Sequence, residues 1–329
     1  MSFVRGLDEI RLIDQTSAGE KAARLGELIG AGFYVPPGFC ITAEAYRETL
    51  VKSQIQKEIL ARLAATEIDD PVDLESAAEE IRGWIENAAI PTAVAQEIQS
   101  AVDALEPGRL FAVRASRVVE DVPNPAASGL QQAYLGVPSG AVLDHVRKCW
   151  SCPWNSRAIY FRNRKKIDQS QLSMAVVVQP MVSADAAGVL FTANPLTGAA
   201  NEIHIDATWG LGEAIIAARW KPDHFIIEKN NPAGDGGDVQ LEIRERAIAT
   251  KIVMELVSPE GGLQTVGVPE QKQDVACLDD EQIAALAAVG QKVQAHFKVA
   301  QDIEWCRVGD RFWLLQTRAC AKDARAPGH

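Results

Sequence analysis

A predicted β-hairpin near the C-terminus carries the residues best suited to bind a metal ion and phosphate. Its two strands place Asp302 and Glu304 on one side of a turn, and Gln316 and Arg318 on the other. Because side chains alternate across a strand, a three-residue loop at 308–310 puts these four side chains on one face. The opposite face is then apolar and carries Ile303, Trp305, Trp313 and Leu315.

The polar face of this hairpin has a composition that calls for a charged ligand. Two carboxylates, an amide oxygen and a guanidinium on a half-buried surface are costly unless matching charge lies among them. Mg²⁺ prefers oxygen ligands, commonly one or two carboxylates with phosphate oxygens and water, and arginine pairs with phosphate. The pattern is therefore suited to a magnesium nucleotide. Without other evidence, however, a surface hairpin with a solvated polar face is the better interpretation than a magnesium nucleotide site.

A second candidate phosphate-binding segment follows an apolar strand expected at 110–116. Arg114 lies at the end of this strand, and a loop rich in proline and small residues follows it to about residue 131. A strand holds an arginine rigidly, and small residues let backbone N–H groups approach anionic oxygens. The loop is not a Walker A motif, and no G-x-G-x-x-G follows a strand.

The order of these and other segments resembles the ATP-binding domain of the phosphoenolpyruvate synthase and pyruvate phosphate dikinase family, which has an ATP-grasp-type fold. The resemblance covers roughly residues 5 to 320. The segments that carry it are 17–28, 35–39, Val113-Arg114, Glu120-Asp121, 177–182, 188–192, 210–213, Pro222-Asp223, 302–305 and 315–318.

The resemblance implies a role for particular residues. Lys21 and Arg114 would contact phosphates, and Arg318 would grip the phosphate tail; these three are the candidate catalytic residues. Glu304 and Gln316 would bind Mg²⁺. The adenine pocket would be lined by Gln179, Pro180, Met181 and Val182, and the loop covering the phosphates would contain Ser128, Gly129 and Gln131. As structural alternatives, Lys21 is an exposed helical lysine, and Arg114 pairs with Glu120 or Asp121.

The phosphate loop departs from the family pattern. Ala115 replaces a serine, residues 117–119 replace a stretch of small residues, and Ala133 stands where a threonine is common. Gln132 and Glu20 likewise replace an acid and a glycine. Lost hydroxyl groups or charges there would weaken phosphate contacts without abolishing them, so ATP binding is expected while turnover is left open.

The resemblance also implies partners. Longer family members carry a swivelling domain with a phosphorylatable histidine in a Thr-Ser-His context, and an acceptor-substrate domain; none of the five histidines of this chain has that context. Either a partner subunit supplies these domains or the chain is a fragment; Met1 and the polar tail 321–329 favour a natural subunit, as in phenylphosphate synthase.

The implied activity is a dikinase-type phosphotransferase that passes a pyrophosphoryl or phosphoryl group to a carrier histidine in trans, with AMP as the nucleotide product. A small molecule would be the final acceptor. Two alternatives remain. One is a nucleotide-binding regulatory module without turnover. The other is a free-standing ATP-grasp ligase, which would form an acyl phosphate and release ADP.

Composition limits the remaining classes of function. A chain of 329 residues with 47% hydrophobic and 23% charged residues is expected to form about two globular lobes. Its formal net charge of -11 argues against nucleic-acid binding. No signal peptide or membrane-spanning run is visible, so a cytoplasmic protein is expected. The six cysteines, including a C-x-x-C pair at 149 and 152, are interpreted as reduced, mostly buried thiols rather than a zinc site.

Hydrophobic periodicity predicts a mixture of helices and strands. The resemblance implies that the segment 174–182 links two lobes, and together these give an expected α+β fold with lobes at 1–183 and 184–320, followed by a polar tail at 321–329. Helices are expected at 17–30, 43–65, 71–104, from about Ser139, and at 279–297, with Ser17 as the cap of the first. Strands are expected at 110–116, 174–182, 187–192, 202–208 and 223–229. The strand at 202–208 alternates apolar residues with Glu202, His204 and Asp206.

Overall fold

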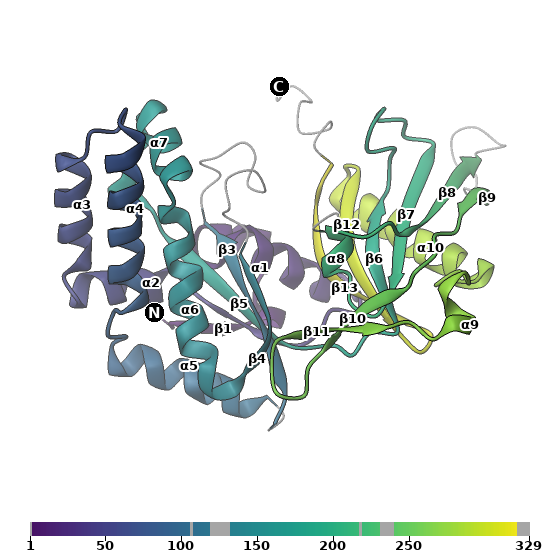
Figure 1. Ribbon diagram of the computed structural model, residues 1–329, viewed down its shortest axis with the longest axis horizontal. Coiled ribbons are helices and arrows are strands. Elements are labelled where there is room, and N and C mark those ends of the chain that lie inside the picture. Colours follow the sequence, from purple (N-terminus) through teal and green to yellow (C-terminus); the bar gives the residue numbers. More distant parts are fainter. Residues whose placement is uncertain (1, 106–107, 119–131, 217–218, 231–239, 321–329) are drawn as a thin grey trace. The chain divides into compact units, whose positions relative to one another are not determined.

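The computed structural model describes residues 2–105, 108–118, 132–216, 219–230 and 240–320 (Figure 1). The chain forms two compact units. Unit 1 contains residues 1–27, 37–181 and 259–262, and unit 2 contains residues 28–36, 182–258 and 263–329. Each unit holds its own antiparallel sheet together with helices, so the predicted α+β class is confirmed.

Unit 1 is built on a five-stranded sheet in which every pair of neighbours is antiparallel. Its strands, in spatial order, are β1 (Val4–Gly6), β2 (Phe39–Ile41), β5 (Met174–Pro180), β3 (Leu110–Arg117) and β4 (Ala133–Pro138). Every residue of β5 is buried, as expected for the continuous apolar run in this segment. The strands predicted at 110–116 and 174–182 are thus present, although the second ends at Pro180.

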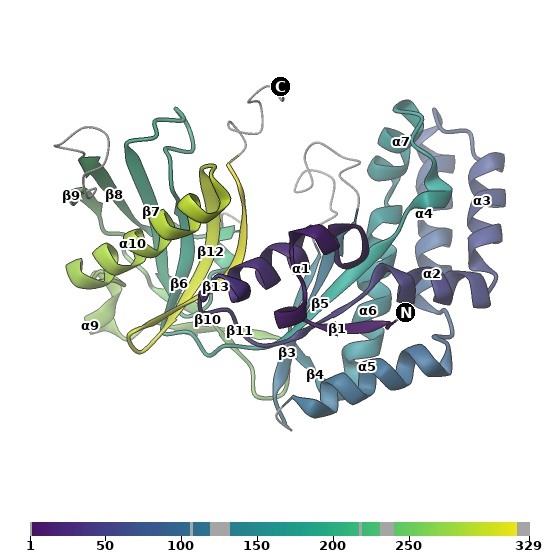
Figure 2. The same cartoon turned by 180° about the vertical axis from the view of Figure 1, so that it is seen from behind.

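The helices of unit 1 pack around this sheet (Figures 1 and 2). They are α1 (Gln15–Gly30), whose last turn belongs to unit 2, α2 (Ala43–Lys52), α3 (Ile55–Ala65), α4 (Pro71–Glu86), α5 (Thr92–Ala104), α6 (Val142–Ser151) and α7 (Ser156–Arg164). The single helices predicted at 43–65 and 71–104 are wrong. Gln54 has a φ of 62°, which breaks the first, and Pro91 precedes α5, which separates it from α4.

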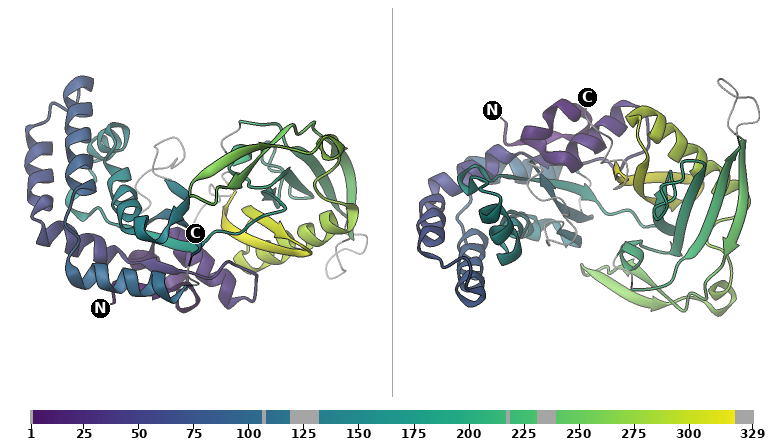
Figure 3. Two further views of the ribbon diagram at one scale, coloured as in Figure 1. Left: turned by 60° about the horizontal axis from the view of Figure 1, so that its bottom comes forward. Right: turned by 90° about the horizontal axis from the view of Figure 1, so that it is seen from above.

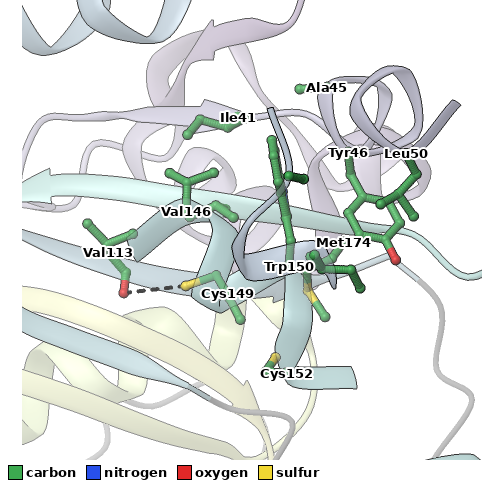
Figure 4. Close-up of a cluster of buried hydrophobic side chains, with 14 of the residues drawn as sticks. Ile41, Ala45, Tyr46, Leu50, Val113, Val146, Cys149, Trp150, Cys152 and Met174 are labelled. Carbon is green, nitrogen blue, oxygen red and sulfur yellow. Dashed lines mark hydrogen bonds between the residues drawn. The ribbon is translucent and has the colours of Figure 1, made fainter. Parts of the chain in front are cut away.

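The core of unit 1 lies between the sheet and α2, α4 and α6 (Figure 4). Trp150 and Trp154 are buried there, and the Trp154 indole nitrogen donates a 2.9 Å hydrogen bond to the Tyr46 hydroxyl. Cys149 lies within α6 and Cys152 just beyond it; both are buried and neither forms a disulfide. None of the six cysteines, all of which lie in the described residues, forms a disulfide, and five of them are buried, as predicted.

Unit 2 is built on a six-stranded antiparallel sheet. In spatial order its strands are β13 (Arg311–Ala319), β12 (Gln301–Val308), β6 (Ala186–Phe191), β7 (Glu202–Trp209), β8 (Asp223–Asn230) and β9 (Gln240–Ala247). The other elements are α8 (Glu213–Ile216), α9 (Glu270–Gln273), α10 (Asp280–Phe297) and a hairpin of β10 (Val253–Val257) with β11 (Leu263–Gly267). The hairpin lies on the other side of the sheet from α10 (Figure 3).

One face of this sheet is apolar and is covered by α10 (Figure 2). Ile303, Leu190, Ile205 and Phe225 form one row across four strands, and all are buried. Gly290 of α10 lies against Leu190 so closely that a Cβ there would be 2.7 Å from a Leu190 methyl group. The helix begins with a capping box between Asp279 and Gln282. We call the opposite face the polar face.

The C-terminal hairpin differs from the prediction in its loop. Val308 pairs with Arg311, so the turn contains two residues rather than three. A β-bulge at Leu315 then shifts the register, and beyond it Glu304 faces Gln316 and Asp302 faces Arg318. The polar set is therefore correct, but the apolar set is wrong on its second strand: Phe312 and Leu314 are buried, whereas Trp313 and Leu315 are half-buried.

No helix within the described residues is long and apolar enough to cross a membrane.

Candidate functional site

Glu304 and Gln316 lie directly opposite each other on the polar face of unit 2. The Glu304 side chain is half-buried and Gln316 is 7% exposed. Within the described part of the chain, neither side chain makes a hydrogen bond or an ion pair. A half-buried carboxylate beside a buried amide, both without protein partners, is an incomplete polar environment that costs free energy until a ligand completes it.

The donor chemistry of this pair fits Mg²⁺, which the sequence resemblance implies. A carboxylate and an amide carbonyl are hard oxygen ligands, and Mg²⁺ commonly takes only one or two of these from protein and the rest from phosphate and water. Across the described residues, no group of three or more His, Cys, Asp or Glu side chains could hold a metal ion. The pair therefore suits a metal that arrives with phosphate better than a metal bound by protein alone.

Arg318 is held at this site by Asp302. The Arg318 guanidinium makes two contacts with Asp302 Oδ2, from Nε at 2.8 Å and from Nη2 at 2.7 Å. Asp302 is largely buried, whereas the Arg318 side chain is 43% exposed. The carboxylate thus orients a guanidinium whose side chain remains partly exposed, an arrangement suited to phosphate.

The row through Glu304 continues across the sheet to a histidine. Glu304 pairs with Val189, Val189 with Asp206, and Asp206 with His224, so all four side chains share the polar face. His224 Nδ1 lies 2.6 Å from Asp206 Oδ1. His224 was not among the predicted site residues. The alternation of polar residues in 202–208 was the available signal, but the register with β8 was needed to complete it.

In unit 1, Arg114 is buried near the middle of β3 at 7% exposure. Its Nη2 donates a hydrogen bond to Gln179 Oε1 on the neighbouring strand β5. Gln179 is 2% exposed, so its amide acts as a fixed support for the guanidinium. Gln179 was predicted to line an adenine pocket; a role in holding Arg114 was missed, because it depends on the pairing of strands far apart in sequence.

One backbone group just after β5 is already hydrogen-bonded within the protein. The Met181 N–H donates a 2.8 Å hydrogen bond to the Leu110 carbonyl. A backbone contact from Met181 to an adenine would therefore come from its carbonyl oxygen. Pro180 is the last residue of β5 and is buried, and Val182 is the first residue of the following segment, in unit 2.

Lys21 lies in α1, just after a kink at Gly19, which has a φ of 75° and a ψ of 165°. Ser116, at the end of β3, holds the kink, because its Oγ donates to the Ala18 carbonyl at 2.8 Å and accepts from the Ala22 N–H at 3.1 Å. Ser116 thus caps the second part of α1, and the predicted cap at Ser17 is wrong, since Ser17 Oγ instead donates to the Asp14 carbonyl.

Lys21 is half-buried, which contradicts its alternative reading as an exposed helical lysine. Burial raises the pKa of the Cys152 thiol to about 12, and the nearby Lys21 cation opposes that rise. Lys21 is therefore near enough to Cys152 for its charge to act on that thiol, and it contributes positive charge within unit 1.

Several predicted residues lie outside the described residues: Ser128, Gly129 and Gln131 of the phosphate loop, together with Glu120 and Asp121. The described residues nearest to this loop are Val118 and Gln132. The structure thus brings together Arg114 with Gln179 in unit 1, and Glu304, Gln316 and Arg318 in unit 2.

Comparison with known proteins identifies the family of this chain. The family profile of the pyruvate phosphate dikinase AMP/ATP-binding domain matches residues 15–328. The chain is 34% identical to phosphoenolpyruvate synthase of Pyrococcus furiosus, with 96% of this chain and 43% of the relative covered. It is also 34% identical to rifampicin phosphotransferase of Bacillus subtilis, with 96% of this chain and 36% of the relative covered.

A probable phosphoenolpyruvate synthase of Pyrococcus horikoshii is 35% identical, again over 96% of this chain and 43% of the relative. The chain thus spans less than half the length of these relatives. Because the matched region covers residues 15–328, which include every strand of the two large sheets except β1, this chain belongs to the pyruvate phosphate dikinase AMP/ATP-binding domain family and has its ATP-grasp-like α+β fold.

Proposed function

We propose that this protein is the ATP-binding component of a dikinase-type phosphotransferase. It binds Mg-ATP and transfers a pyrophosphoryl or phosphoryl group to a carrier histidine on a partner polypeptide, with AMP as the nucleotide product. The observation that carries the proposal is the facing pair of Glu304 and Gln316, a carboxylate and an amide without protein partners on a sheet face that also carries Arg318.

In this proposal, the residues that the family resemblance assigns to ATP contact one nucleotide. Glu304 and Gln316 hold Mg²⁺, which would neutralise charge on the phosphates when bound. Lys21, Arg114 and Arg318 bind phosphate oxygens, and Gln179 keeps the Arg114 guanidinium in place. Since phosphoryl transfer depends on positioning and charge neutralisation, guanidinium groups fixed by Gln179 and Asp302 are well suited to it.

The remaining contacts of the proposal come from the family resemblance. Ser128, Gly129 and Gln131 would cover the phosphates, and the backbone of 179–182 would contact adenine. In this proposal the carrier histidine and the acceptor-substrate site belong to a partner subunit. The chain matches 43% of the phosphoenolpyruvate synthase and 36% of the rifampicin phosphotransferase, which leaves room for such domains in the relatives. A small molecule would be the final acceptor, in the cytoplasm.

The test uses ATP labelled at the β-phosphate, incubated with this protein and a separately produced histidine-domain polypeptide. We expect AMP and an acid-labile phosphohistidine on the partner. ATP binding without AMP at any partner concentration would instead indicate a regulatory module. ADP formation with a carboxylate substrate and no partner would indicate a ligase.

A further inference from the structure

The polar face of unit 2 holds a group of titratable side chains that the proposed ATP contacts do not use. His224 Nδ1 lies 2.6 Å from Asp206 Oδ1, and His204 Nε2 lies 2.9 Å from Glu202 Oε2. The centroids of the two imidazole rings are 5.4 Å apart. The two pairs come from the adjacent strands β7 and β8 and form one cluster.

The two histidines differ in what they leave accessible. The His204 side chain is 9% exposed and contacts Glu202. The Glu202 carboxylate also accepts a hydrogen bond from Asn194 at 2.7 Å and forms an ion pair with Arg244 at 3.0 Å. The His224 side chain is 33% exposed. Its Nδ1 is engaged by Asp206, and within the described residues its Nε2 has no hydrogen-bond partner. His204 thus supports the cluster, while His224 presents one free ring nitrogen.

Asp206 controls both the orientation and the charge of His224. A carboxylate at Nδ1 fixes the proton there and leaves Nε2 as the ring nitrogen that can contact a ligand. The hydrogen bond from His224 to Asp206 raises the pKa of the imidazole, and this outweighs the opposing effect of burial. Glu245 on β9 raises it further. The positive form is therefore favoured, and an imidazolium N–H on a sheet face is a donor for an anionic oxygen.

The position of His224 relative to Glu304 is set by the sheet. The two residues lie in one row, separated by three strand spacings, or about 14 Å between backbones at about 4.8 Å per spacing. Both side chains stand on the same face. A metal ion about 2.1 Å from each oxygen ligand, a phosphate group and a hydrogen bond together cover most of that separation.

We infer that His224, oriented by Asp206, is a phosphate-binding residue that contacts the terminal phosphate of a nucleotide whose metal is held by Glu304 and Gln316. The inference rests on the proposed function and adds to it a fourth cationic contact, located on β8. It also gives Asp206 the part of a positioning residue.

Charged groups on the strands around His224 determine how the contact depends on pH. Asp206 and Glu245 favour its protonation, the Glu202 charge is shared with Arg244 and His204, and Glu304 lies farther along the row. A raised pKa means that the His224 imidazolium is present below that pKa and is lost as pH rises through it. Affinity for the terminal phosphate should therefore fall as pH rises.

The experiment measures binding by calorimetry for three probes, each with Mg²⁺: the non-hydrolysable ATP analogue AMP-PNP, ADP and AMP. Wild type, His224→Gln and Asp206→Asn are compared from about pH 6 to about pH 8.5, where histidines titrate. His145→Gln serves as the matched control, because His145 lies in unit 1 and its Nδ1 contacts only the Ala141 carbonyl. Thermal unfolding of each variant verifies the fold.

We expect His224→Gln to weaken AMP-PNP binding about tenfold, the loss of about 1.4 kcal/mol of a charge-assisted contact. Binding of AMP should not change, and the fall in AMP-PNP affinity with rising pH should disappear. In Asp206→Asn, the decrease of AMP-PNP affinity with rising pH should remain but occur at lower pH than in wild type. His145→Gln should behave as wild type.

Two results would overturn the inference. One is a His224→Gln variant with wild-type affinity for AMP-PNP at every pH; the other is an equal loss for AMP-PNP and AMP, which would mark a structural role. Either leaves the proposed function standing if wild type binds Mg-AMP-PNP. Failure of wild type to bind any of the three nucleotides would overturn the proposed function and the inference together.

Discussion

The Arg114 guanidinium donates a hydrogen bond to the Gln179 side-chain oxygen, joining two central strands of unit 1 through their buried side chains. An arginine held in this way keeps a fixed direction, so little conformational entropy is lost when it binds phosphate. The pair is therefore a support for an anion contact as much as a part of the core.

Replacing this arginine tests the support directly. Arg114→Lys keeps the charge but cannot reproduce the geometry of the guanidinium, and we expect ATP affinity to fall at least about tenfold. Gln179→Leu should give a smaller loss, because the charge stays in place while its orientation is released. Calorimetry with Mg-AMP-PNP measures both. Equal affinity in wild type and Arg114→Lys would contradict a role in phosphate binding.

Glu304→Gln should separate function from stability. The substitution removes the negative charge from a half-buried carboxylate that has no partner among the described residues, so the unfolding temperature should stay the same or rise. Mg-ATP affinity should nevertheless fall about tenfold or more. Asp302→Asn is the comparison variant: it weakens the ion pair with Arg318 and should not raise stability. A large loss of stability in Glu304→Gln would show that the carboxylate has a structural role.

The kink in α1 gives a prediction about backbone strain. Gly19 has a φ of 75° and a ψ of 165°, and a Cβ there would lie 2.4 Å from the Ser116 carbonyl oxygen. Gly19→Ala should therefore lower the free energy of unfolding by at least about 2 kcal/mol. Gly32→Ala is the matched control, because Gly32 also has a positive φ but no atom within 4 Å of an added Cβ. It should cost about 1 kcal/mol. Equal losses, measured by denaturant unfolding, would exclude the contact with Ser116 as the cause.

A buried ion pair stabilises unit 2. Lys251 Nζ lies 2.6 Å from Asp223 Oδ1, and the Asp223 carboxylate also accepts from the N–H groups of Ala249 and Cys277. Lys251→Met leaves that carboxylate buried without its cation, and we expect a loss of about 3 kcal/mol or more. Arg246→Ala removes an ion pair with Asp280 whose side chains are 45% and 69% exposed, and should cost less than about 1 kcal/mol. Similar losses of unfolding free energy in Lys251→Met and Arg246→Ala would contradict a stabilising role of the buried ion pair.

Acid stability should depend on Glu202. Hydrogen bonds from His204 and Asn194 lower the pKa of this carboxyl from 4.5 to about 2. A depressed pKa contributes stability that is present above the unfolded value and is lost as pH falls through the folded value, here between about 4.5 and about 2. Glu202→Gln should flatten that part of the stability curve, measured by denaturant unfolding at a series of pH values. An unchanged slope would show that other groups dominate.

Much of the fold was predictable because local patterns determined it. The continuous apolar run at 174–180 and the alternation at 202–208 each identified a strand. The breaks within 43–65 and 71–104 were not predicted, since a single left-handed Gln54 does not interrupt the hydrophobic period. The predicted three-residue length of the hairpin loop was also wrong, although the bulge at Leu315 restored the predicted register of Glu304 and Gln316.

The candidate site was predictable only where its partners are close in sequence. Asp302, Glu304, Gln316 and Arg318 lie on one hairpin, and strand periodicity placed them on one face. The contacts of Arg114 with Gln179 and of Asp206 with His224 depend on the pairing of strands separated by other elements. No local pattern in a single sequence specifies that pairing, so these contacts emerged only with the structure.

The central claim is that the assigned residues, Glu304 and Arg114 among them, bind one nucleotide together with its metal ion. Mn²⁺ in place of Mg²⁺ allows this to be measured by electron paramagnetic resonance, with AMP-PNP present, for wild type, Glu304→Gln and Arg114→Lys. We predict that wild type binds one Mn²⁺ per chain only when the nucleotide is present, and that each variant loses this binding. Nucleotide-dependent Mn²⁺ binding that persists undiminished in either variant would contradict the account.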